Sequence, residues 1–142
     1  MTEARSVADG LAAGALAGAL SGIPSTAWTL VRGRSPLGAV RAAGTLVLPP
    51  AAGPSSLLVA GAGAHTVISF AWAMLLAAVL PDHRTRTAGA AAGLAIAALD
   101  LGAVGRRYPA IRALPAQPQI ADHLAFGLLV GAVVRARRRR RP

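Results

Sequence analysis

The stretch 57-LLVAGAGAHTVISFAWAMLLAAVL-80 decides the fold of this chain. It carries no formally charged residue, and it is bounded by Pro54 on one side and by Pro81-Asp82 on the other. A helix rises about 1.5 Å per residue, so a bilayer core about 30 Å thick needs roughly 20 apolar residues. A run of this length and composition predicts a helix that crosses a membrane.

Three further apolar runs accompany the first. Soluble domains average about a quarter charged residues, whereas this chain has 14% charged and 54% apolar residues, and its mean hydropathy is +0.53. The sequence therefore predicts an all-α integral membrane bundle of four transmembrane helices, in one domain over residues 1–134. The spans are expected at residues 11–31, 57–80, 87–104 and 119–134.

A shorter apolar segment lies in the first loop. Ser35-Pro36 is a helix-start signal and Pro49-Pro50 ends the segment, which predicts a helix over residues 36–48. About 13 residues are too few to cross a bilayer, and Arg41 stands in the middle of the segment. We expect an interfacial helix lying on the membrane, with a partly re-entrant helix as the alternative.

The arginines predict the orientation. Four spans place both termini and the 81–86 loop on one side, and more arginines lie on that side than on the other. Short loops rich in basic residues face the cytoplasm, so both termini are expected there. Every basic residue is Arg and alanine is abundant, which is typical of a GC-rich bacterial genome. The predicted location is the bacterial cytoplasmic membrane.

Residues 135–142 read as an Arg-rich cytoplasmic tail. Each Arg near an anionic lipid surface contributes about 1 kcal/mol of binding. The tail is therefore expected to fix the topology and to bind anionic lipids, and nucleic acid is not an expected partner because no aromatic residues interleave with the basic ones. The arginines concerned are Arg135, Arg137, Arg138, Arg139, Arg140 and Arg141.

Small residues recur at helical spacing in three of the spans. In lipid, helices associate through close backbone approach and dispersion, so such ridges predict tight helix packing. One ridge could instead make a homo-oligomer, and that alternative stays open. The packing glycines are Gly10, Gly14, Gly18 and Gly22 in the first span, Gly89 and Gly93 in the third, and Gly127 and Gly131 in the fourth.

Four ionisable residues at membrane depth form the candidate site: Asp100, His65, Asp122 and His123. Such residues are expensive in a bilayer and by default suggest a function. With the termini inside, all four fall in the outer half of the bundle. Asp100 follows Gly93 by seven residues and His123 precedes Gly127 by four, so both lie on helix-packing faces.

Two of the four also have a plainer interpretation. Asp122 would cap the first turn of its own helix, and His65 would hydrogen-bond a neighbouring helix. Asp100 is near no helix N-terminus that it could cap, and it is expected to act as a proton carrier or as the partner of His65 or His123. The spacing of these residues matches no standard metal motif, so neither a metal nor a cofactor is expected.

Enzyme motifs are missing from the sequence. It has no cysteine, no phosphate loop, no dinucleotide-binding turn, no HExxH and no nucleophile elbow. The leading interpretation is a non-enzymatic structural or accessory membrane component. The alternative is a small oligomeric transporter or channel whose polar cluster binds a proton or a cation. A lipid-binding membrane enzyme is a third, weaker interpretation.

Four segments occur in an order known from one protein family: GLAAGALAGALSG at 10–22, AHTVISFAWAMLLAAVLP at 64–81, GAAAGLAIAALDLG at 89–102 and ADHLAFGLLVG at 121–131. In this order, and in the placing of His65 before Ser69-Phe70 and of His123 in the last span, the chain resembles the YagU-type four-span bacterial inner-membrane proteins. The resemblance implies an integral membrane protein, with no cofactor or catalytic residue to carry over.

Overall fold

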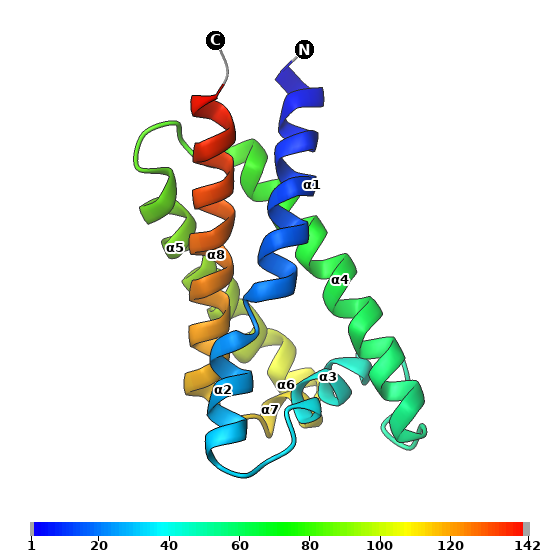
Figure 1. The fold of residues 1–142 in the computed structure, drawn as a ribbon. Coiled ribbons are helices and arrows are strands. Elements are labelled where there is room, and N and C mark those ends of the chain that lie inside the picture. The colour runs from blue at the N-terminus through cyan, green and yellow to red at the C-terminus, as the bar shows by residue number, and fades with distance from the viewer. Residues whose placement is uncertain (1, 141–142) are drawn as a thin grey trace.

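We describe the fold from a computed structural model, which defines the backbone of residues 2–140 and the side chains of residues 6–140. Within this range every regular element is helical (Figure 1). Arg141 of the predicted basic tail lies outside the described residues. In chain order the elements are α1 (Thr2–Leu20), α2 (Ile23–Val31), α3 (Leu37–Gly44), α4 (Pro54–Val79), α5 (Thr85–Leu99), η1 (Asp100–Val104), α6 (Gly105–Arg107), α7 (Pro109–Arg112) and α8 (Ala116–Arg139).

Four helical stretches of the described chain are long and apolar enough to cross a membrane: Ser6–Val31, Pro54–Val79, Thr85–Arg107 and Ala116–Arg139. The predicted all-α fold with four membrane-spanning helices is confirmed. Large apolar side chains point away from the protein along these stretches, such as Val59, which is 76% exposed, and Val67, which is 69% exposed. Such exposure suits a surface that faces lipid, since water would penalise it.

The helix bounds differ from the sequence expectation in three places. The first span is broken, because α1 ends at Leu20 and α2 begins at Ile23. The third span continues from α5 through the π-helical turn η1 into α6, and it ends where Pro109 holds Tyr108 in an extended conformation, at φ −120° and ψ 98°. Helix α8 runs on to Arg139, so most of the expected tail is helical.

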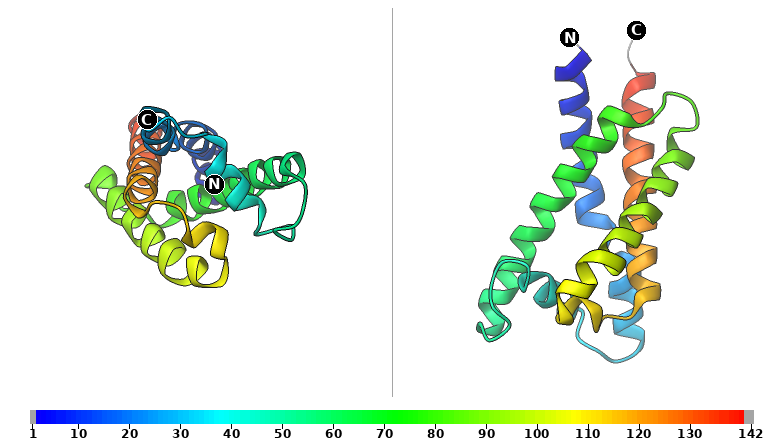
Figure 2. Two further views of the ribbon diagram at one scale, coloured as in Figure 1. Left: turned by 90° about the horizontal axis from the view of Figure 1, so that it is seen from below. Right: turned by 180° about the vertical axis from the view of Figure 1, so that it is seen from behind.

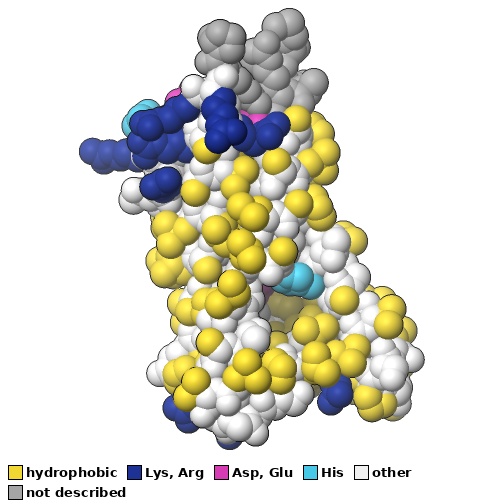
Figure 3. Space-filling model, in the orientation of Figure 1, with side chains coloured by type: hydrophobic (Ala, Val, Ile, Leu, Met, Phe, Trp, Pro, Cys, Tyr) yellow, Lys and Arg dark blue, Asp and Glu magenta, His cyan; other side chains and the backbone are white. Residues whose placement is uncertain are grey.

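The two ends of the bundle differ in shape. At one end, here called the terminal end, lie the start of α1, the end of α8 and the connection from α4 to α5 (Figure 1). At the other end, the loop end, lie α3, α6, α7 and the end of α2. Helix α4 crosses α1 and then diverges from α2 and α8 toward the loop end (Figure 2). Figure 3 shows a hollow between the diverging limbs on this face, lined by apolar side chains.

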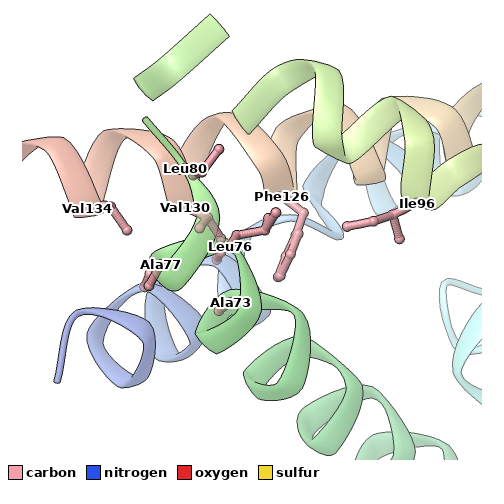
Figure 4. Packing of buried hydrophobic residues seen from close by; sticks show 10 residues of the cluster. Ala73, Leu76, Ala77, Leu80, Ile96, Phe126, Val130 and Val134 are labelled. Atoms are coloured by element: carbon pink, nitrogen blue, oxygen red, sulfur yellow. The ribbon is translucent and has the colours of Figure 1, made fainter. Parts of the chain in front are cut away.

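The buried core lies on the terminal side of this divergence. Small residues of α1 allow α4 and α8 to approach it, and larger residues of α4, α5 and α8 fill the space between these helices (Figure 4). Val130 and Val134 of α8 are completely buried. The members of the core cluster are Ala13, Ala17, Ala73, Leu76, Ala77, Leu80, Ile96, Phe126, Val130 and Val134.

Glycines set the helix crossings. A Cβ added to Gly10 would lie 2.7 Å from the Cα of Met74 on α4, and one added to Gly14 would lie 2.7 Å from the Phe70 ring. On α5, a Cβ at Gly89 would collide with the Gly127 carbonyl of α8. The contacts follow the predicted ridges with one difference. Nothing lies within 4 Å of a Cβ at Gly22, because the first span breaks there.

The short helix of the first loop is docked on α4. It spans Leu37–Gly44 rather than 36–48, because residues 45–48 form turns instead of continuing the helix. Cβ atoms at Gly44 and Gly61 would collide with the Leu57 and Val40 carbonyls across the contact, so two bare backbones touch there. The interfacial placement of this helix stays a prediction.

Candidate functional site

A break in the first span exposes backbone groups within a membrane-spanning stretch. Ser21 and Gly22 form a turn between α1 and α2, and Pro24 has no N–H to donate to the preceding helical turn. The end of α1 therefore leaves carbonyl groups without helical partners, and the start of α2 leaves N–H groups without them. In hydrocarbon such groups need partners within the protein.

Two ionisable side chains from other helices supply these partners. The backbone N–H of Ser25 in α2 donates to Oδ1 of Asp122 on α8, at 2.8 Å between N and O. Nε2 of His65 on α4 lies 2.9 Å from the Gly18 carbonyl oxygen of α1. A carbonyl only accepts, so His65 donates through Nε2. A carboxylate thus sits at the positive N-terminus of α2, and an N–H group sits at the negative C-terminus of α1.

The position of Asp122 corrects one sequence interpretation. Asp122 lies beyond the first turn of α8, which begins at Ala116 and has no acidic residue there. It therefore caps α2 rather than its own helix. The interpretation of His65 as a hydrogen-bond partner of a neighbouring helix agrees with its contact to Gly18.

The second half of the site joins α5 to α8. Asp100 is the first residue of the π-helical turn η1, and its Oδ2 lies 2.9 Å from Nε2 of His123. The other ring nitrogen of His123, Nδ1, lies 2.7 Å from the carbonyl oxygen of Gln119. The side chains of His123 and Asp100 are 20% and 31% exposed. π-Helical turns are rare and frequently occur at functional sites.

This geometry requires a proton between His123 and Asp100. The Gln119 carbonyl can only accept, so Nδ1 of His123 carries a hydrogen. Nε2 faces a carboxyl oxygen. The hydrogen bond forms either when both ring nitrogens are protonated and Asp100 is ionised, or when His123 is neutral and Asp100 is protonated. Both forms carry no net charge and contain the same number of protons, and losing one proton leaves the pair with a negative charge.

The two halves meet on α8. Asp122 and His123 are neighbours in sequence, and one contacts α2 while the other contacts η1. The structure therefore brings Asp100, Asp122 and His123 together on and against α8. His65 bonds the Gly18 carbonyl of α1 instead, and among the described residues it forms no hydrogen bond with the other three. Of the two partners expected for Asp100, it pairs with His123.

Sequence reasoning missed the backbone members of the site. These members are the Gly18 and Gln119 carbonyls and the Ser25 N–H, and the pattern of side-chain types does not reveal which backbone groups take part. Pro24 does indicate an interrupted helix. Across the described part of the chain, no group of three or more His, Cys, Asp and Glu residues is arranged to hold a metal ion.

A second polar network, which the sequence analysis also missed, closes the terminal end. Nε of Arg137 donates to Oδ1 of Asp9 at 2.8 Å, and the Asp9 side chain is 2% exposed. Arg138 donates to the carbonyls of Ala77 and Leu80, at 3.0 and 2.9 Å, and so caps the end of α4. It also pairs with Asp82. Two of the arginines expected to bind lipid are therefore engaged with protein groups.

No family model, no curated protein and no solved structure matches this chain. The resemblance to the YagU-type proteins stays a prediction.

Proposed function

We propose that this protein is a small, non-enzymatic transporter of the bacterial cytoplasmic membrane that takes up and releases a proton at Asp100 and His123. The observation that carries the proposal is the hydrogen-bonded chain from Asp100 through His123 to the Gln119 carbonyl, which holds one exchangeable proton. Ionisable pairs within transmembrane helices typically mark proton relays. Release of the proton changes the charge of the pair from zero to negative, and this supplies a driving force for conformational change.

The surrounding packing favours a carrier over an open channel. On α8, the segment between His123 and the terminal end contains Phe126, Val130 and Val134, which are buried in the core. Close-packed apolar side chains on this stretch disfavour a continuous file of water. In the proposed mechanism a proton therefore crosses when the helices rearrange, as in a carrier.

We propose α2 as the element that moves. Only Ser25 of this helix is buried, and α2 packs mainly on α8 while α4 diverges from it. The Asp122 carboxylate holds the N-terminus of α2. By analogy, many transporters place their binding sites at discontinuous helices whose half-helix ends face charged groups. In this mechanism a rearrangement at His123 on α8 is passed to α2 through the neighbouring Asp122, whose hydrogen bond to the Ser25 N–H holds the helix start.

Proton flux into liposomes tests the proposal. The full chain is reconstituted with a pH-sensitive dye inside and a pH gradient is imposed. Asp100→Asn keeps a hydrogen-bonding group but cannot ionise, and His123→Gln removes the ring. The matched controls are Asp82→Asn and His83→Gln, which change the same residue types in an exposed loop.

We expect flux in the wild type and both controls, and flux at the level of protein-free liposomes in Asp100→Asn and His123→Gln at equal incorporation. Flux that persists in both site variants would refute the role of the pair. Absence of proton flux in every protein would refute proton transport.

A structural or accessory role is the second candidate. The observation that favours it is that all four site residues have hydrogen-bond partners that join helices. On this hypothesis Asp100→Asn leaves function unchanged, because the amide still bridges η1 and α8. The same variant therefore separates the two candidates.

Three further proposals concern the setting of the protein. Cytoplasmic termini would place the arginines of the terminal end against the inner leaflet, with Arg135, Arg139 and Arg140 available for anionic lipids. Cysteine-accessibility labelling in intact cells tests the orientation, because the native chain has no cysteine.

A homo-oligomer is supported by the small share of residues in each span that are buried within one chain, which lies between 22% and 33%.

A further inference from the structure

A pocket lies at the loop end, and none of the four candidate site residues lines it. Its walls are the segment between α3 and α4 and the segment from the end of α6 to the start of α7, and its volume is about 460 Å³. Helix α3 contacts α7 at this end, and Figure 1 shows α3, α6 and α7 close together there. The lining residues are Thr45, Leu46, Val47, Leu48, Pro49, Pro50, Arg107, Tyr108, Pro109 and Ala110.

The lining combines an apolar wall with two free polar groups. Leu46, Val47 and Leu48 supply the apolar wall from one side. The Thr45 hydroxyl is used internally, since it donates to the Ala42 carbonyl at 2.6 Å. In the part of the chain that the structure describes, the Arg107 guanidinium and the Tyr108 hydroxyl take part in no hydrogen bond or ion pair. These two groups can bind a ligand.

The charged residues at this end favour the binding of an anion. Residues 32–50 and 104–117 contain no Asp or Glu. The nearby acids Asp100 and Asp122 are bonded to His123 and Ser25. Nε of Arg41 on α3 is buried without a hydrogen-bond partner, which is unusual for a guanidinium. The arginines in these two segments are Arg32, Arg34, Arg41, Arg106, Arg107 and Arg112.

We propose that this pocket binds the headgroup of an anionic phospholipid. The phosphate accepts hydrogen bonds from the Arg107 guanidinium, whose fork matches phosphate oxygens, and from the Tyr108 hydroxyl. The acyl chains leave along Leu46, Val47 and Leu48. An inorganic phosphate would satisfy the arginine but would leave this apolar wall uncovered, whereas a phospholipid matches both parts. Basic pockets beside transmembrane helices commonly hold anionic lipid headgroups.

The site is separate from the proposed transport function and from the C-terminal arginines, which lie at the terminal end. A lipid bound here would join the α3–α4 connection to the end of the third span, because the two walls of the pocket belong to these segments.

Lipid titration with native mass spectrometry tests the proposal on the full chain in detergent. The probes are phosphatidylglycerol, phosphatidylcholine and inorganic phosphate. The test variants are Arg107→Gln and the milder Tyr108→Phe, which keeps the ring. The control is Arg34→Gln, which removes an equal charge from an exposed position at the same end that does not line the pocket. Circular dichroism checks that each variant is helical.

We expect the wild type and Arg34→Gln to bind phosphatidylglycerol about tenfold more tightly than phosphatidylcholine, a ratio that Arg107→Gln removes. Tyr108→Phe weakens phosphatidylglycerol binding without changing phosphatidylcholine binding, and it decides the question if Arg107→Gln does not fold. Equal losses in Arg107→Gln and Arg34→Gln would overturn the proposal in favour of diffuse charge attraction. Full competition by inorganic phosphate would overturn it in favour of a free-anion site.

Discussion

The carboxylate of Asp122 accepts a hydrogen bond from the backbone N–H of Ser25, a residue that precedes it by 97 positions, at 2.8 Å. This contact caps a helix that starts inside a membrane-spanning stretch, and the cap comes from the last span. An N-cap normally belongs to the chain segment just before its helix. Here Gly22 occupies that place and its residue type has no side chain to contribute, so the position of α2 depends on α8.

Two substitutions of Asp122 should therefore distinguish the contribution of its charge from the contribution of its hydrogen bond. Asp122→Ala removes the cap and should lower the free energy of unfolding by about 1 to 2 kcal/mol. Asp122→Asn keeps an acceptor oxygen, and Asn caps helices about as well as Asp, so its effect should be within about 0.5 kcal/mol. Unfolding by sodium dodecyl sulfate, followed by circular dichroism, measures both. Equal destabilisation by the two variants would contradict the cap.

Of the same two variants, only Asp122→Ala should change the position of α2. Spin labels at Ala27→Cys and Leu128→Cys report the distance from α2 to α8, and the native chain has no cysteine to interfere. We expect a broader distance distribution with Asp122→Ala and the wild-type distribution with Asp122→Asn, measured by pulsed electron resonance. An unchanged distribution with Asp122→Ala would mean that side-chain packing alone holds α2.

The proton assignment at His123 can be observed directly. Because the Gln119 carbonyl accepts from Nδ1, this nitrogen should show the ¹⁵N chemical shift of a protonated imidazole nitrogen. In Asp100→Asn the ring should be neutral, with Nδ1 as its only protonated nitrogen, because an amide does not balance the charge of an imidazolium. Solid-state NMR of ¹⁵N-histidine protein in lipid measures this, and His83→Gln and His65→Gln variants assign the signals. A bare Nδ1 would contradict the arrangement described above.

The glycines at the crossing of α5 and α8 should tolerate no side chain. A Cβ at Gly89 or at Gly127 would collide with the backbone of the opposite helix, so Gly127→Val should destabilise the protein by more than about 2 kcal/mol through forced helix separation. Gly22→Ala is the matched control, since nothing lies near its Cβ position. The midpoint of unfolding by sodium dodecyl sulfate compares them, and equal midpoints would contradict the close approach of α5 and α8.

The buried carboxylate at the terminal end should couple to Arg137. Asp9 is 1% exposed, so removing one partner of its ion pair leaves the other poorly solvated. Because Arg137 is 43% exposed, we expect a coupling energy of only about 1 kcal/mol. A double-mutant cycle with Asp9→Asn and Arg137→Gln measures it. Strictly additive effects would show that the contact contributes no stability of its own.

Sequence patterns predicted those features that depend on local composition. Span number follows from apolar run length, and the placing of Asp100 and His123 on helix-packing faces follows from their register with Gly93 and Gly127. That register left both His65 and His123 open as the partner of Asp100, and the structure selects His123. Features that depend on contacts between distant residues were not predictable. Asp122 seemed to be an early residue of its own helix because the start of α8 at Ala116 is set by Pro115 and not by apolar periodicity.

The basic tail shows the same limit. A run of arginines after the last apolar residue resembles a solvated extension, yet α8 continues to Arg139. Arginine favours helices, and positive charge suits a helix C-terminus. The further reason is tertiary, because Asp9 and the exposed carbonyls at the end of α4 bind Arg137 and Arg138. No property of the tail itself reveals those partners.

The contacts between the first and last spans also order the biogenesis of the protein. A ribosome releases α1 and α2 well before it makes α8, so a nascent chain enters the bilayer with the Ser25 N–H uncapped. The ion pair between Asp9 and Arg137 likewise forms only when α8 is present. The first span therefore has to stay within the insertion machinery, or at its boundary with the lipid, until the last span is inserted. A chain cut before α8 would present that unfinished helix to membrane quality-control proteases.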